Sequence, residues 1–218
     1  MIQYLYGFII LTALGILYEK YKQKYVPDEQ LKDYDLISKF LLNGNGGSNL
    51  AKKPILWIYT ERRVNSRSWP SFYSRNTKQL NQPYLISCVE TIIKKCGSSF
   101  NICLIDDTSF KRLLPDWNIY LDRIGDPVKS HFVLLALTKV LHRYGGMLVP
   151  NSTIVMKDLL PVYNSALRTK CCFAVEGLNR GNTAEYVELF PMTTFMGCKQ
   201  NSPVMNQFVS FLERKVRH

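Results

Sequence analysis

Histidine and negative charge are scarce in this chain. It has three dispersed histidines in 218 residues, and 17 Asp and Glu against 28 Lys and Arg. Three isolated histidines do not make a zinc cluster. The six cysteines contain no Cys-x-x-Cys pair, which argues against a dense disulfide framework and predicts reduced, mostly buried thiols. A Ser/His/Asp constellation and a phosphate-cradling glycine loop are also missing from the sequence.

The positive charge is spread over the chain. The net charge is +11, and the basic residues form small groups such as Lys52/Lys53 and Arg62/Arg63 rather than one run. A surplus of this size favours anionic partners, among them phosphates and lipid headgroups. The sequence contains no signature of a nucleic-acid-binding module. We therefore expect no specific nucleic-acid partner, and a solvated basic surface accounts for most of these residues.

The N-terminus is predicted to be a membrane anchor. Ile2–Tyr18 is a run of 17 residues without a charged side chain. As a helix that rises about 1.5 Å per residue, it spans roughly 25 Å, close to a hydrocarbon core of about 30 Å. Lys20, Lys22 and Lys24 follow the run and no basic residue precedes it, which places the C-terminal domain on the cytoplasmic side. A buried core helix is the alternative interpretation.

The chain is predicted to have three parts. Residues 1–25 are the transmembrane anchor with its juxtamembrane stretch. Residues 26–52 contain a short amphipathic helix, Glu29–Leu42, and then a flexible linker rich in Asn and Gly. The chain is 46% hydrophobic, which is sufficient for one α/β domain with its own core over residues 53–218.

Strands and helices alternate in the C-terminal domain. Short apolar runs are typical of buried strands, and longer segments with helical spacing indicate helices. In chain order these are strand Pro54–Thr60, helix Tyr84–Lys95, strand Phe100–Ile105, helix Val128–Tyr144 and strand Met147–Val149. Asp126 is expected to cap the second helix and Gly145 to end it, and Asp107 or Thr108 to cap a further short helix. This order predicts an open, mostly parallel α/β sheet with flanking helices.

One segment resembles a known enzyme family. Tyr144-Gly145-Gly146, followed by the apolar strand Met147–Val149, is similar to the place where capsular-polysaccharide-synthesis and DXD-sugar glycosyltransferases carry Tyr-Gly-Gly, a strand and Asp-X-Asp. The resemblance implies a GT-A, Rossmann-like fold. In that family the aspartates hold the divalent metal that binds the sugar-nucleotide diphosphate. Here Pro150, Asn151 and Ser152 occupy the acidic positions.

The departures from the family pattern predict that its metal-dependent mechanism does not operate. A hard cation prefers anionic oxygen ligands, and the residues at the acidic positions carry no charge. The family helix also begins with Ser-Asp and carries an Arg one turn later, whereas His131 follows Ser130 here. We therefore expect no metal site at this segment.

Three carboxylates are the candidates for any catalysis. Asp106 and Asp107 follow a predicted strand, at the sheet edge where open α/β proteins bind ligands. Helix capping and solvation are the alternative interpretation of this pair. Glu176 follows the predicted strand Cys171–Val175 and is the best further carboxylate for acid–base chemistry, but no partner for it is identified.

Two functions fit the sequence. The first is a membrane-anchored, catalytically degenerate glycosyltransferase-like protein, a pseudoenzyme without a cofactor. It would be a structural component of a membrane-associated assembly, such as the capsid–membrane layer of a virion or an organellar complex. Its partners would be the membrane, through Ile2–Tyr18, and other protein subunits. The second is an active nucleotide-sugar glycosyltransferase that is metal-independent, or that uses Asp106 and Asp107 with Mn²⁺ or Mg²⁺. The neutral segment at residues 150–152 favours the first function.

Overall fold

The protein is described by a computed structural model that covers residues 53–61, 83–179, 181 and 185–217. The predicted anchor Ile2–Tyr18, and the helix and linker predicted within residues 26–52, lie outside the described residues. None of the described helices combines the length and the apolar composition that crossing a membrane requires.

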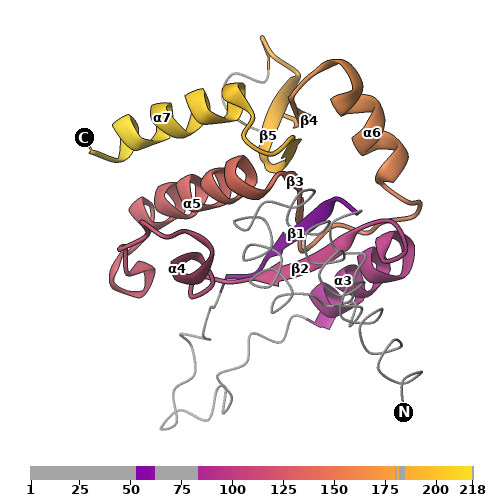
Figure 1. Cartoon of the computed structure of the whole chain (residues 1–218), viewed down its shortest axis with the longest axis horizontal. Coiled ribbons are helices and arrows are strands. Elements are labelled where there is room, and N and C mark those ends of the chain that lie inside the picture. The colour runs from indigo at the N-terminus through magenta and orange to yellow at the C-terminus, as the bar shows by residue number, and fades with distance from the viewer. Residues whose placement is uncertain (1–52, 62–82, 180, 182–184, 218) are drawn as a thin grey trace, which may run out of the picture. The chain divides into compact units, whose positions relative to one another are not determined.

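A mixed five-stranded sheet forms the centre of the domain (Figure 1). Its strands are β1 (Ile55–Tyr59), β2 (Asn101–Ile105), β3 (Gly146–Pro150), β4 (Cys172–Leu178) and β5 (Leu189–Cys198). The spatial order is β2-β1-β3-β5-β4. β1 pairs in parallel with β2 and with β3, whereas β5 is antiparallel to both β3 and β4. The predicted α/β class is confirmed, but the parallel pairing holds for three strands, and a β4–β5 hairpin extends the sheet in the antiparallel sense.

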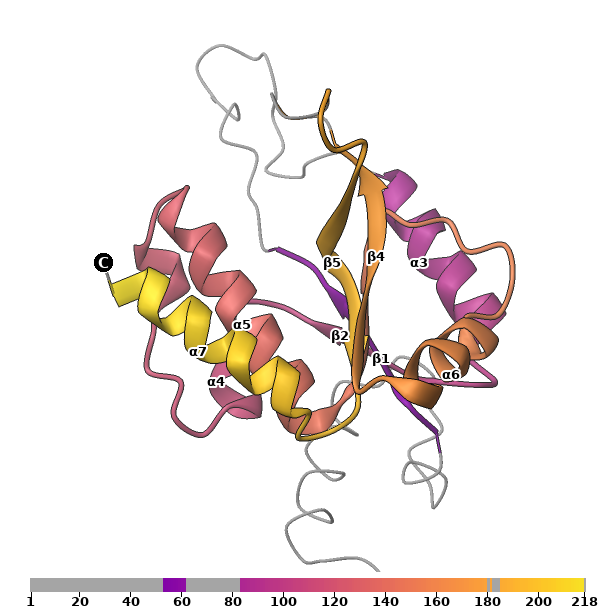
Figure 2. The same ribbon diagram turned by 90° about the horizontal axis from the view of Figure 1, so that it is seen from above.

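Helices cover both faces of the sheet (Figure 2). One face carries α3 (Pro83–Cys96) and α6 (Leu160–Thr169). The other carries α5 (Val128–Tyr144), α7 (Pro203–Arg217) and the short α4 (Phe110–Leu113), and a single 3₁₀ turn, η3 (Leu121–Arg123), precedes α5. α5 and α7 pack against each other, and Lys139 Nζ lies 2.6 Å from Glu213 Oε1 between them. The described part is therefore a three-layer α/β/α domain.

The core explains why the three parallel strands are almost uniformly apolar. Strands of a parallel sheet are covered by helices on both faces, so both sets of alternating side chains are buried. Towards α3, the buried strand residues pack with Ile92 and Cys96; they are Leu56, Ile58, Ile102, Met147 and Val149. Towards α5, the Trp57 ring lies 5.8 Å from the Tyr144 ring between centroids. These two faces fix the register of β1 between its neighbours.

α5 has the bounds that the sequence predicted, Val128 and Tyr144, but not the predicted cap. Pro127 occupies the N-cap position and makes no side-chain capping bond. The Asp126 carboxylate instead accepts a hydrogen bond from the Ser130 hydroxyl at 2.7 Å. Asp126 therefore stabilises the first turn by accepting a hydrogen bond from the Ser130 side chain, and not as the N-cap of the helix.

A double-glycine turn joins α5 to the centre of the sheet. Gly145 and Gly146 have φ values of 70° and 98°, a region that favours glycine. The Gly145 N–H donates to the Leu141 carbonyl at 2.8 Å, and the Gly145 carbonyl accepts the Trp57 indole N–H at 2.9 Å. The predicted helix end at Gly145 is confirmed, and the turn delivers β3 between β1 and β5.

Candidate functional site

The carboxyl ends of the three parallel strands lie side by side. Tyr59 at the end of β1 pairs in register with Ile105 of β2 and with Pro150 of β3. The residues that follow these strands therefore emerge at one edge of the sheet. Open α/β sheets bind ligands at this edge, and both the Asp106-Asp107 pair and the neutral segment at residues 150–152 are located there.

Asp106 organises the turn after β2. One oxygen of its carboxylate accepts the backbone N–H groups of Thr108 and Ser109, both at 3.0 Å, and also their hydroxyls at 2.8 and 2.7 Å. Partial burial opposes ionisation of this carboxyl, but the hydrogen bonds from Ser109 and Thr108 outweigh it and lower the pKa of Asp106. The predicted cap at Asp107 or Thr108 is wrong, because Ser109 is the N-cap of α4 and Asp106 accepts the turn's donors.

Asp107 belongs to an ion-pair network. Lys129 Nζ lies 2.9 Å from Asp107 Oδ2 and 3.2 Å from Glu61 Oε1, and the Tyr59 hydroxyl donates to Asp107 Oδ1. The side chains of Asp107 and Lys129 are only 13% and 14% exposed. Both oxygens of the Asp107 carboxylate are therefore engaged by protein donors in a site that is largely shielded from water.

The network shifts the ionisation of its members. Burial raises the pKa of Tyr59, and the hydrogen bond to Asp107 and the charges of Asp107 and Glu61 raise it further. Burial lowers the pKa of Lys129, but its hydrogen bonds to Asp107 and Glu61 outweigh this and give a net rise. Tyr59 therefore stays protonated and Lys129 stays charged near neutral pH, which suits a structural network better than proton transfer.

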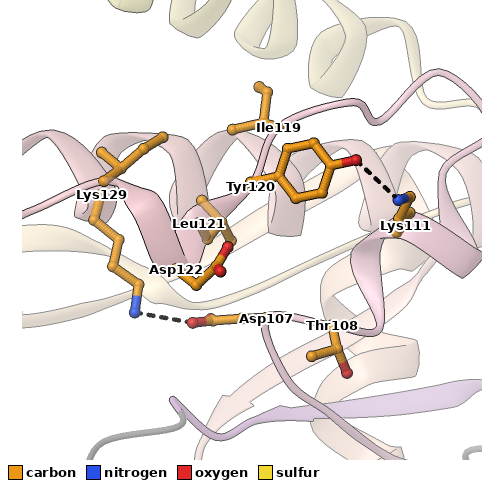
Figure 3. A pocket seen from close by; sticks show the side chains of 9 residues that line it. Asp107, Thr108, Lys111, Ile119, Tyr120, Leu121, Asp122 and Lys129 are labelled. Atoms are coloured by element: carbon orange, nitrogen blue, oxygen red, sulfur yellow. Dashed lines mark hydrogen bonds and ion pairs between the residues drawn. The ribbon is translucent and has the colours of Figure 1, made fainter.

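A cavity of about 500 Å³ opens beside this network (Figure 3). Asp107 and Lys129 form one wall, and Lys111, Tyr120 and Asp122 contribute to the rest. Lys111 Nζ lies 4.8 Å from the centroid of the Tyr120 ring and 3.4 Å from its hydroxyl, as Figure 3 shows for the latter pair. Two lysines, Lys111 and Lys129, therefore line the cavity. The ion pairs with Asp107 and Glu61 already neutralise Lys129.

A second, more apolar cavity of about 370 Å³ lies between α5 and β5. Tyr59, Val133, Leu134 and Thr194 are among the residues that line it. His131 also lines this cavity, and its Nδ1 is 3.0 Å from the Pro127 carbonyl one turn earlier. This local contact holds the imidazole within its own helix.

The neutral segment after β3 does not fit a divalent metal. Pro150 is the last residue of β3, and the Thr153 N–H donates to its carbonyl at 3.1 Å, which closes a turn over Asn151 and Ser152. The donor set of this turn has no negative charge, and the carboxylate of Asp107 at the same edge already faces a lysine ammonium. A hard cation needs anionic oxygen ligands. Within the described ranges, no group of three or more His, Cys, Asp and Glu side chains is placed to hold a metal ion.

The structure does not bring the three candidate carboxylates together. Glu176 does not follow its strand, as predicted, but lies within β4, opposite Pro191 of β5. β4 is the outermost strand on one side of the sheet. β2, which leads into Asp106 and Asp107, is the outermost strand on the opposite side. The Glu176 side chain is exposed. Glu176 is therefore not part of the site at the carboxyl edge.

Sequence reasoning missed Tyr59, Glu61 and Lys129 as members of the site. One signal for Lys129 was available. The N-terminal turn of a helix carries partial positive charge, so a lysine there is unfavourable unless an anion lies close by. α5 has no acidic residue in its first turn, so the anion had to come from another element.

The comparisons with known proteins add no relative. The chain matches no family model, and no curated protein or solved structure is significantly similar to it.

Proposed function

We propose that this chain is a membrane-anchored, catalytically degenerate glycosyltransferase-like protein that acts as a structural component of a membrane-associated assembly. Ile2–Tyr18 would hold it in the membrane, with residues 53–218 on the cytoplasmic side. The engagement of both Asp107 oxygens by Lys129 and Tyr59 is the observation that carries the proposal. A capsid–membrane layer of a virion and an organellar complex are both settings of this kind.

The glycosyltransferase-like, GT-A interpretation draws support from the double-glycine turn. Gly145 and Gly146 lead directly from a long helix into the central strand β3. That is the position the resemblance to DXD-sugar transferases gives to the Tyr-Gly-Gly segment. The antiparallel hairpin beyond β3 is compatible with the same fold.

Electrostatics support a non-catalytic role. The segment at residues 150–152 offers no charge to a metal, and Asp107 could serve one only by giving up Lys129. Separating this pair, whose side chains are 13% and 14% exposed, costs about 2 kcal/mol. One oxygen of the Asp106 carboxylate is committed as well, since it accepts four hydrogen bonds within its own turn. The paired carboxylates therefore serve the structure of the edge rather than acid–base chemistry.

The cavity beside the network favours one alternative, an active nucleotide-sugar glycosyltransferase. Lys111 and Lys129 line it together with Asp107, and lysines are suited to a diphosphate. Such an enzyme would be metal-independent, or would use Asp106 and Asp107 with Mn²⁺ or Mg²⁺.

The deciding experiment uses the full-length chain in detergent micelles. Sugar transfer, nucleotide-sugar hydrolysis and calorimetric binding are measured for a panel of nucleotide sugars, with and without Mn²⁺. We expect no turnover and no metal-stimulated binding. The double variant Pro150→Asp/Ser152→Asp is expected to remain inactive, because Lys129 still neutralises the neighbouring carboxylate.

One result would replace the structural role with the enzymatic one. That result is turnover by the wild type that Asp106→Asn and Asp107→Asn abolish. Asn151→Ala/Ser152→Ala is the matched variant for the structural role. It is expected to be recovered in membranes at the same level as the wild type, because neither side chain has a catalytic task to lose.

A further inference from the structure

The outer half of the β4–β5 hairpin carries a group of exposed apolar side chains. Leu178 and Leu189 are paired in register, and Leu178 is 67% exposed. Phe190 is 58% exposed, and Tyr186 and Val187, which precede β5, are exposed as well. We call these five side chains the hairpin patch. A two-stranded hairpin by itself is at best marginally stable in water, and exposed apolar patches mark interaction sites.

The hairpin patch is accompanied by negative charge, in a chain whose net charge is +11. Residues 176–190 contain three glutamates and one basic residue, Arg180. Glu176, Glu185 and Glu188 are exposed, and none of the three has an ion-pair partner among the residues that the structure describes. The anionic surface of a cytoplasmic leaflet repels such a group of carboxylates. The hairpin patch therefore suits a basic protein surface better than a lipid surface.

α7 has an exposed apolar stripe beside the one that it buries. The buried stripe is formed by residues at helical spacing, Met205, Val209 and Leu212. Val204, Phe208 and Phe211 repeat this spacing one residue earlier, and Phe211 is 44% exposed. The Phe208 and Phe211 rings are stacked, with their centroids 6.4 Å apart. We call Val204, Phe208 and Phe211 the helix patch. A surface helix needs one apolar stripe to pack on its own domain, so the second is available to a partner.

The helix patch is accompanied by positive charge. Arg214 and Lys215 are exposed, and Lys215 Nζ lies 5.8 Å from the centroid of the Phe211 ring. Glu213 is the only acidic residue of α7, and it is paired with Lys139 of α5. The two patches thus carry opposite charges. Both contain exposed side chains in a single copy of the chain, so neither covers the other.

We propose that the hairpin patch of one copy of this chain docks on the helix patch of a second copy. Docking removes the apolar side chains of both patches from water and brings the glutamates of the hairpin to Arg214 and Lys215. Contact between two like patches would bring like charges together, which is unfavourable. The contact is therefore head-to-tail, and its repetition builds a ring or an open chain of copies. The proposal rests on the structural role inferred above and names a partner for it.

The test measures the mass of the full-length protein in detergent micelles by light scattering, over a series of protein concentrations. We expect the wild type to associate. Phe190→Asp in the hairpin patch and Phe211→Asp in the helix patch should each raise the dissociation constant at least about ten-fold, because each places a charge among apolar side chains. Ile86→Asp is the matched control and should leave it unchanged, since Ile86 is a 65% exposed residue of α3. A melting curve of each variant shows that it is folded.

A mixture of the two variants distinguishes a head-to-tail contact from a symmetrical one. Phe190→Asp keeps its helix patch and Phe211→Asp keeps its hairpin patch, so an equimolar mixture should form a mixed dimer at the wild-type dissociation constant. Sensitivity to only one variant would show a contact between like patches, and sensitivity to neither would assign association to the anchor or to another surface. Either result, an absence of mixed dimers, or a wild type that stays monomeric would overturn the proposal. These measurements concern association alone, so the structural role itself still depends on the turnover assay.

Discussion

At the scale of single residues, the charge of Lys129 determines whether Asp107, at the carboxyl ends of the parallel strands, is free to bind a ligand. Its ammonium sits in the first turn of α5, where the helix dipole disfavours a cation by roughly 0.3–1 kcal/mol. Asp107 and Glu61 compensate from the ends of β2 and β1. These contacts offset the unfavourable position of the lysine. Because they engage Asp107, its carboxylate is not free to bind a metal.

The first prediction concerns Asp107→Asn. The amide leaves Lys129 with one carboxylate fewer in a site that is 13–14% exposed, and we expect a loss of about 2 kcal/mol of stability. For a chain of this size, that lowers the melting temperature by about 4–8 °C. Circular dichroism melting of the full-length chain in micelles measures it.

Asp122→Asn is the control for that variant. Asp122 is an exposed carboxylate that lines the same cavity, and its replacement is expected to change stability by at most about 0.5 kcal/mol. Equal melting temperatures for the two variants would show that the network does not stabilise the fold.

The second prediction concerns Asp106 and acid pH. Its folded-state pKa is lowered by the hydrogen bonds from Ser109 and Thr108, whereas the unfolded value is about 3.9. A lowered pKa contributes stability that is complete above the unfolded value and is lost as the pH falls through the folded value. The wild type should therefore melt higher than Asp106→Asn at pH 6, and the gap should narrow as the pH falls below about 4. A gap that stays constant between pH 6 and pH 2.5 would contradict this role.

At the scale of elements, the junction of α5 and β3 is where the backbone conformation is most restricted. A Cβ on Gly146 would lie 2.2 Å from the Ile55 carbonyl oxygen, and a Cβ on Gly145 would lie 2.7 Å from the Gln200 backbone nitrogen. Both contacts are with backbone, which cannot swing aside as a side chain would. The turn therefore depends on glycine for space as well as for positive φ.

The third prediction follows from this geometry. Gly145→Val is expected to destabilise the protein by more than about 1 kcal/mol, the size of an ordinary helix-end change. Gly146→Ala should cost about 3 kcal/mol or more, because β1 and β3 must move apart. Urea denaturation of the full-length chain measures both.

Gly125→Ala provides the matched control for the two glycine variants. A Cβ at Gly125 meets nothing within 4 Å, so we expect a change within about 0.5 kcal/mol. If Gly145→Val were as stable as Gly125→Ala, the double-glycine turn would not be the constraint on the fold.

At the scale of the whole molecule, the fourth prediction is the orientation in the membrane. The uncharged Ile2–Tyr18 run and the lysines that follow it predict a single-pass protein with residues 53–218 on the cytoplasmic side. In sealed vesicles with the cytoplasmic face outward, added protease should digest that domain. Protection of the domain until detergent is added would show the opposite orientation.

Local patterns in the sequence determined most of the elements. Apolar runs gave β1, β2 and β3, and Gly145 gave the end of α5, because burial on both sheet faces and a positive-φ helix end each depend on a few adjacent residues. The mixed direction of the sheet was not predictable in this way. β5 inserts between β3 and β4, and that choice rests on pairing between residues far apart in the chain.

The roles of the acidic residues were decided by tertiary structure alone. The sequence identified Asp106 and Asp107 as a pair at a strand end, but it did not tell them apart. Asp106 turns back onto Thr108 and Ser109. Asp107 reaches Tyr59, because the parallel register places the end of β1 beside the end of β2, and it reaches Lys129 at the start of α5. Composition and spacing specify which groups are present. Which of them are neutralised depends on partners from other elements, such as Lys129 of α5, that only the tertiary structure brings within 3 Å.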